Sequence, residues 1–124
     1  MKDYRDLKAW KKAVRLAVGI YKLIKYLPAE EKYAIADQMK RAAVSVASNI
    51  AEGHKRYNIK EFKYFLKISM GSLAELETQL TICLEADMLS ENIVNQALKA
   101  CNELDKMIYS LIKSLPNTIQ QLDK

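Results

Sequence analysis

Residues 62–83 read FKYFLKISMGSLAELETQLTIC, and one core-spaced series runs through the whole stretch. Its members alternate at spacings of four and three residues: Phe62, Leu66, Ser69, Leu73, Leu76, Leu80 and Cys83. Side chains at those spacings lie on one side of an α-helix. The stretch therefore predicts a long amphipathic helix with one buried stripe.

Three other segments share this period, and short breaks separate them. The first has core spacing at Leu7, Trp10, Val14, Ala17, Tyr21 and Ile24, and the last at Ile93, Ala97, Ala100, Leu104, Met107 and Leu111. We expect helices at about 6–27, 29–53, 58–86 and 90–114. Connections this short require successive helices to lie antiparallel. The predicted fold class is all-α: an antiparallel up-down-up-down four-helix bundle over residues 1–116, with a frayed tail at 117–124.

Residues with known helix-end preferences support these boundaries. Asp6, Asn58 and Ser90 each precede an apolar-periodic segment and are predicted N-caps. Pro28 can occupy the first turn of the second helix, followed by two acids that favour a helix N-terminus. Gly53 suits the left-handed position after the end of that helix.

The composition fits a single soluble domain. The chain has 124 residues with only three glycines and two prolines, too few for the many turns that strands need. No run of about 18 apolar residues occurs, so we expect no membrane span and a cytoplasmic location.

Signatures of catalysis are missing. The single histidine, His54, is expected in a solvated loop beside Lys55 and Arg56, whose charges disfavour an imidazolium. No glutamate is followed by histidine three residues later, as di-iron bundles require. Cys83 and Cys101 fall at core-spaced positions and are expected to be buried thiols. We predict no enzyme activity, metal or cofactor.

The positive charge is concentrated at the N-terminus. Residues 1–27 carry a net charge of +6, more than the +5 of the whole chain. Six cations of this segment cluster within about 120° of a helical projection, opposite the predicted apolar stripe: Arg5, Lys8, Lys11, Lys12, Arg15 and Lys22. Such a face either solvates the protein or attracts phosphates.

A second basic segment, HKRYNIKEFKYF at 54–65, interleaves cations with aromatics, as proteins that bind looped or single-stranded RNA do. The candidate nucleic-acid-binding residues are Lys8, Lys11, Lys12, Arg15, Lys22, Lys55, Arg56, Tyr57, Lys60 and Lys63. The alternative is a protein-interaction scaffold whose charge only solvates it. A metal-dependent nuclease is a third possibility, for which no ligand cluster is visible.

Residues 41–53, RAAVSVASNIAEG, combine small apolar residues with a polar series. We interpret this helix as a packing seam against the third helix, formed by Arg41, Ser45, Asn49, Glu52, Gly71, Ser72 and Glu75. In an antiparallel hairpin Arg41 lies level with Glu75, which predicts a largely buried contact between them or with a neighbouring subunit's equivalent. Gly71 would permit close backbone approach.

Three quoted stretches resemble a known family. They are YRDLKAWKKA, LPAEEKYAIADQMKRAAVSVASNIAEG and EFKYFLKISMGSLAELETQL. Together they look like the four-helix proteins of 23S rRNA intervening sequences, also called the S23 ribosomal protein family. The resemblance implies homo-oligomers, commonly pentameric rings. It also implies kinship with the accessory variability determinant of diversity-generating retroelements, a basic bundle that binds nucleic acid and a reverse transcriptase.

Assembly also has support from the residues. Leu16, Ile20, Leu23 and Leu27 flank the predicted stripe of the first helix, and uncovered apolar surface of that size is typical of interfaces. The sequence thus favours a non-enzymatic homo-oligomer, a pentamer by resemblance, that binds nucleic acid, with RNA preferred.

Overall fold

The computed structural model describes residues 3–117. Four α-helices make up most of it: α1 (Lys8–Leu23), α2 (Ile35–His54), α3 (Ile59–Glu85) and α4 (Glu91–Ser114). Short 3-10 helices lie at Tyr4–Asp6 (η1), Ile24–Tyr26 (η2) and Ala29–Glu31 (η3). The described residues contain no β-strand, which confirms the all-α class. The tail predicted at 117–124 falls, except for its first residue, outside the described part.

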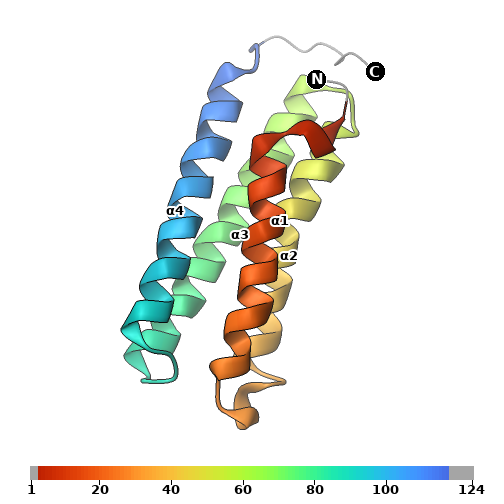
Figure 1. Cartoon of the computed structure of the whole chain (residues 1–124). Helices are drawn as coiled ribbons and strands as arrows, with labels where there is room; N and C mark the ends of the chain where they lie inside the picture. Colours follow the sequence, from red (N-terminus) through yellow and green to blue (C-terminus); the bar gives the residue numbers. More distant parts are fainter. Residues whose placement is uncertain (1–2, 118–124) are drawn as a thin grey trace.

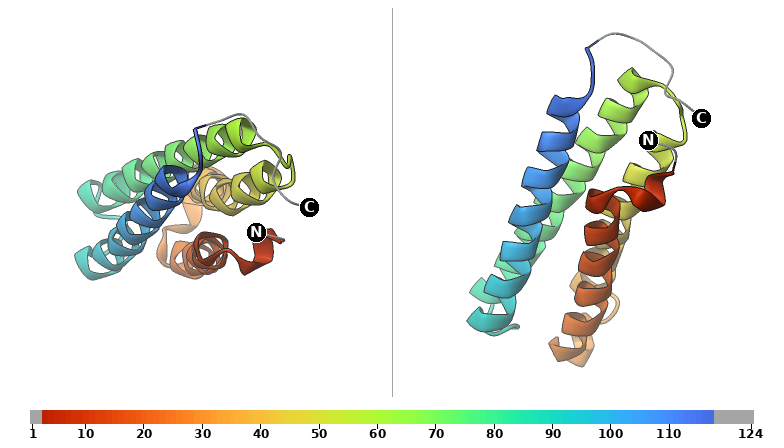
Figure 2. Two further views of the ribbon diagram at one scale, coloured as in Figure 1. Left: turned by 90° about the horizontal axis from the view of Figure 1, so that it is seen from above. Right: turned by 45° about the horizontal axis from the view of Figure 1, so that its top comes forward.

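The helices are arranged around a single core. In Figure 1, α1 runs down the molecule, α2 returns, α3 runs down again and α4 returns. Figure 2 shows α1 beside α2 and α3 beside α4, and α2 packs most extensively against α3. Among the described helices, none combines the length and the apolar composition needed to cross a membrane.

The predicted stripe of α3 forms the centre of the core. All seven of its members are buried, from Phe62 at one end to Cys83 at the other. Burying a large aliphatic side chain stabilises a fold by about 1.5–3 kcal/mol. This helix therefore contributes much of the apolar burial, and its neighbours arrange themselves around it.

The stripes of α1 and α4 are rotated from their predicted positions. In α1 the buried residues are Ala9, Ala13, Leu16 and Ile20. In α4 they are Val94, Ala97, Cys101, Leu104 and Ile108. The predicted stripe of α1 is only partly covered, and Tyr21 is 47% exposed. Because both helices have wide apolar faces, the sequence fits two adjacent stripes, and packing against α2 and α3 selects one.

Two of the three predicted N-caps are confirmed. The Asn58 side chain accepts a hydrogen bond from the Glu61 N–H at 3.0 Å, and Ser90 accepts one from the Ile93 N–H at 3.2 Å. Asp6 was assigned wrongly, because it lies inside η1, and the N-cap residue of α1 is Leu7, without a side-chain cap.

The second helix begins later than predicted, at Ile35 rather than at residue 29. Leu27 is extended, as is usual before proline, and η3 then forms a separate turn. Ala34 has φ −120° and ψ −106°, which separates this turn from α2. The wide connection lets both Leu27 and Ala36 reach the core, where they are buried.

Candidate nucleic-acid interface

The cations of α1 lie on the side of that helix that borders α4. Four of them, Lys8, Lys11, Arg15 and Lys22, are exposed, and no carboxylate of residues 3–117 lies within ion-pair distance of any of them. We call these four residues the α1 cation face. Arg5, from the same cluster, is instead paired with Asp3 at 2.8 Å.

Lys12 differs from its neighbours on α1. Its side chain is only 25% exposed, and Nζ lies 3.1 Å from Glu103 Oε1 on α4. This pair links the two helices, so Lys12 is partly neutralised before any phosphate arrives. Its role as a nucleic-acid contact is weakened by this partner.

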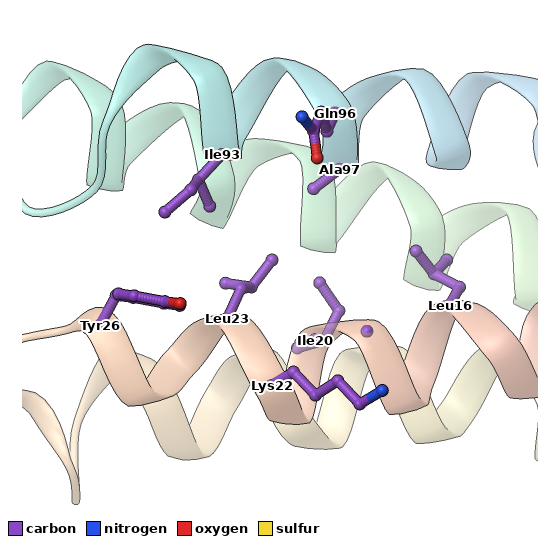
Figure 3. Close-up of a pocket in the computed structure, with 9 residues that line it drawn as sticks. Leu16, Ile20, Lys22, Leu23, Tyr26, Ile93, Gln96 and Ala97 are labelled. Atoms are coloured by element: carbon purple, nitrogen blue, oxygen red, sulfur yellow. The ribbon is translucent and has the colours of Figure 1, made fainter.

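A groove lies between α1 and α4, next to the α1 cation face. Figure 3 shows Leu16, Ile20 and Leu23 of α1 opposite Ile93 and Ala97 of α4. Lys22, Tyr26 and Gln96 also line it. One core was not expected to cover all four of Leu16, Ile20, Leu23 and Leu27; it covers more of them than expected, since three are buried and Leu23 is partly buried. Leu16 and Ile20 nevertheless border this open groove.

The loop cations form a separate surface at the α2–α3 turn. Arg56 is held by two carboxylates, at 2.9 Å from Glu52 Oε2 and 3.8 Å from Glu61 Oε1. Lys63 Nζ donates to Asn117 Oδ1 at 3.0 Å. Lys55 and Lys60 are exposed. The groove here, lined by Arg56, Lys60 and Tyr64 among others, shares no residue with the groove of Figure 3.

The aromatic residue best placed for stacking in this loop is Tyr64 rather than Tyr57. Tyr57 is partly buried, adopts φ 53° and has its ring edge-on to His54. Tyr64 is 62% exposed and lines the loop groove. Its position on the outer side of α3, away from the buried stripe, is the sequence signal that distinguishes it.

His54 does not lie in a solvated loop, which corrects the prediction. It is the last residue of α2, is only 1% exposed and packs edge-on against the Phe62 ring, with 5.5 Å between ring centroids. Gly53 is helical as well, so its predicted left-handed conformation is also wrong. Tyr57 supplies the positive φ that closes this turn.

Hydrogen bonds join α2 and α3 along part of the predicted polar seam. The Ser45 and Ser72 hydroxyls lie 2.8 Å apart, and within α2 Asn49 Nδ2 donates to the Ser45 carbonyl oxygen at 2.8 Å. Ser69, buried in the α3 stripe, donates to the Val46 carbonyl oxygen at 2.9 Å. These short polar side chains satisfy each other and fix the register of the two helices.

Within one chain Arg41 does not contact Glu75, so the predicted intrachain pair is wrong, whereas the contact with a neighbouring subunit's equivalent stays a prediction. Its side chain is 69% exposed, and Nη1 lies 2.9 Å from Asp37 Oδ2 one turn earlier on the same helix. Glu75 is exposed on α3. Burying an ion pair costs free energy because it removes the hydration of both charges, so an exposed pair such as that of Arg41 and Asp37 avoids this cost.

The close approach of α2 and α3 occurs at Gly53, not at Gly71. A Cβ placed on Gly53 would lie 2.5 Å from Phe65 Cβ, too close for two carbon atoms. A Cβ on Gly71 would meet nothing within 4 Å. Gly71 is therefore exposed on one chain, and so is Gly19 on α1.

The thiols are unreactive by position. Cys83 and Cys101 are free and buried, as predicted. Burial raises the pKa of both, that of Cys101 to about 12, with the Glu77 charge adding to the effect. A thiol with such a pKa remains protonated at neutral pH, and only the thiolate is a good nucleophile. The described residues also contain no cluster of three potential metal-ligating side chains.

The fold and this surface define a small helical bundle with one cationic helix face and a polar helix–helix seam. Residues 5–110 match the model of the 23S rRNA-intervening sequence protein family, and the chain belongs to that family. A crystal structure at 1.70 Å of an S23 ribosomal protein family member of unknown function from Bacteroides thetaiotaomicron is similar, with a TM-score of 0.79 and 24% identity. The match covers 86% of this chain and 99% of that one. None of the curated proteins matches the sequence. Neither description names an enzymatic activity.

Proposed function

We propose that the protein binds RNA through the α1 cation face. The observation that carries the proposal is the set of four exposed cations on one helix with no acidic partner among residues 3–117. Mixed-sign surfaces neutralise themselves, whereas a one-sign face creates a field that attracts polyanions. Phosphate contacts of this kind give affinity without sequence preference.

The loop surface supports RNA over duplex DNA. Lys60 and the exposed Tyr64 line one groove, so a strand held there has both a cation for its phosphate and a ring for an unpaired base. Stacking on aromatic side chains suits loops and single strands, whose bases are accessible. Arg56 contributes less than predicted because Glu52 and Glu61 already hold it.

We further propose that copies of the chain assemble through the groove between α1 and α4, five of them by family resemblance. The occupant is the outer side of α3 from a second copy, which carries Gly71 and the exposed Ile82. A mid-helix glycine costs about 1 kcal/mol relative to alanine, and neither Gly19 nor Gly71 has a contact in one chain that requires it. The opposite net charges of residues 1–27 and 59–89, +6 and −2, favour this pairing. Lys22 lines the groove and would lie at this interface, which leaves Lys8, Lys11 and Arg15 for RNA.

A mobility-shift experiment tests the RNA proposal. The triple variant Lys8→Glu, Lys11→Glu, Arg15→Glu should weaken binding to all RNA sequences about equally. Lys12 is left intact because Lys12→Glu would face Glu103. The matched control Lys67→Glu, Lys99→Glu, Lys113→Glu makes a comparable charge change at exposed lysines of α3 and α4 and should retain more binding.

Salt dependence gives the second readout. For single strands the log–log slope should be about −0.7 per phosphate contact. Absence of any shift with structured RNA, single strands or duplex DNA at about 50 mM salt would refute the proposal. The apolar groove between α1 and α4 would then favour a protein-interaction scaffold.

A further inference from the structure

The connection between α1 and α2 lies at the end of the bundle opposite the start of α1 (Figure 1). A cleft of about 420 Å³ lies at this connection. The buried Leu27 and Ala36, together with Ile24, form the apolar part of its lining, which we call the apolar floor, and the half-exposed Tyr21 also lines it. It exists because η2, the extended Leu27–Pro28 segment and η3 make a wide turn before α2 begins.

Three lysines line this cleft: Lys25, Lys32 and Lys40. Within the described chain, none of them lies at ion-pair distance from a carboxylate. The neighbouring acid on α2, Asp37, is instead paired with Arg41. Three lysines thus border one concavity, and no carboxylate of residues 3–117 lies at ion-pair distance from them.

Aromatic rings hold two of these ammonium groups. Lys40 Nζ lies 5.8 Å from the Tyr21 ring centroid, and Lys32 Nζ lies 5.4 Å from that of Tyr33. At exposed sites a cation–π contact is weak. Charge-assisted hydrogen bonds to phosphate oxygens are stronger. A phosphate in the cleft can therefore compete with Tyr21, which lines the cleft, for Lys40, and with Tyr33, which does not line it, for Lys32.

We propose that this cleft binds a nucleotide. Its base lies on the apolar floor beside Tyr21, and its phosphate groups contact Lys25, Lys32 and Lys40. The volume lies within the range of about 300–1,000 Å³ typical of small-molecule sites. Inorganic phosphate alone leaves the apolar floor uncovered, and a single carboxylate leaves two ammonium groups without a partner. A flat aromatic group joined to a polyanion matches both parts.

This site shares no residue with the α1 cation face and goes beyond the proposed RNA binding. The nucleotide can be a free one or the phosphorylated end of a strand, since both present the same chemistry. The experiment therefore includes both sources.

The probes are ADP, AMP, adenosine and inorganic phosphate, measured by calorimetry on the full chain. ADP should bind most tightly, AMP less, and adenosine and inorganic phosphate each at least about tenfold more weakly than ADP, which corresponds to about 1.4 kcal/mol. Equal affinity for ADP and adenosine, or for ADP and inorganic phosphate, would overturn the proposal.

The variant Lys25→Gln, Lys32→Gln, Lys40→Gln should weaken ADP binding about tenfold or more. The control Lys67→Gln, Lys99→Gln, Lys113→Gln removes the same charge elsewhere and should leave ADP binding nearly unchanged. If both variants lose ADP affinity equally, the effect comes from net charge alone, and the proposal that ADP binds in the cleft is wrong. Circular dichroism melting checks that both variants fold. The variant Tyr21→Leu keeps an apolar side chain but loses the ring, so it should weaken the binding of ADP more than the binding of inorganic phosphate.

Competition against ADP separates the two sources. Displacement by a 5′-phosphorylated oligonucleotide, but not by its 5′-hydroxyl form, assigns the cleft to strand ends, and displacement by neither assigns it to free nucleotides. The two sites are independent if the variant Lys8→Glu, Lys11→Glu, Arg15→Glu keeps ADP binding but loses the RNA mobility shift. If the α1 variant loses ADP binding while the Lys25→Gln, Lys32→Gln, Lys40→Gln variant keeps it, the proposal that the cleft binds a nucleotide is wrong.

Discussion

The α2–α3 pair and the α1–α4 pair are held together in different ways. Between α2 and α3, Gly53 lets a backbone approach Phe65, and Ser45 and Ser72 meet at 2.8 Å. Between α1 and α4, the ion pair of Lys12 and Glu103 is the one polar side-chain link among the described residues, and an apolar groove remains open.

The difference separates stability from function. Short polar groups and a glycine give the α2–α3 seam a fixed register with its polar groups satisfied, so little of it is available to a partner. The α1–α4 side keeps its cations exposed and its groove open. The tightly packed α2–α3 seam thus supports the α1–α4 side, where we propose that the main RNA contacts lie.

Among the changes that test this difference between the two helix pairs, truncating a core leucine should have the largest effect on stability. Leu76→Ala, in the fully buried stripe of α3, should lower the free energy of unfolding by about 2–5 kcal/mol. Leu23→Ala, at the half-buried edge of the α1–α4 groove, should cost less than about 1.5 kcal/mol in a single chain. Urea unfolding at low protein concentration measures both, and equal losses would show that the groove is part of the core.

The two glycines should respond in opposite directions. Gly53→Ala should destabilise the chain by about 1–3 kcal/mol, because the new methyl group overlaps Phe65. Gly71→Ala should stabilise the isolated chain by up to about 1 kcal/mol through helix propensity. Thermal melting compares them, with multi-angle light scattering as the second measurement. If Gly71 lies at the interface between two copies of the chain, Gly71→Ala also weakens their association. A monodisperse monomer of the unmodified protein at micromolar concentration would contradict the proposed assembly.

The smallest effect is expected at the α1–α4 ion pair. Glu103→Gln should change stability by less than about 1 kcal/mol, since Glu103 is half exposed and surface pairs contribute little. It should also release Lys12 and tighten RNA binding, by less than about tenfold. A mobility shift compared with that of Glu91→Gln, a change at an exposed acid in the first turn of α4, isolates the effect of the pair. Weaker binding by Glu103→Gln would mean that the pair positions Lys12 for its contact.

The sequence alone determined the features that depend on residues close together in the chain, such as the spacing within one helix and the cap at its end. All seven residues of the predicted α3 stripe are buried, because the four-three alternation runs unbroken along this helix. Asn58 and Ser90 were predicted because a cap needs only its own helix end. The cations of α1 were also identified correctly as one exposed side, with Lys12 as the exception, since charged residues rarely occupy a core.

Only the tertiary structure decided which of several equivalent options each helix uses. The wide apolar faces of α1 and α4 fit two stripes, and their neighbours selected the one that includes Ile20 and Cys101. Glycine spacing does not distinguish Gly53, which meets Phe65, from Gly71, which meets nothing, because the distance between two backbones is set by the whole pair of helices. The cleft at Lys25, Lys32 and Lys40 is likewise a product of the turn geometry: the sequence supplies its charges, and packing of Leu27 and Ala36 into the core brings them together.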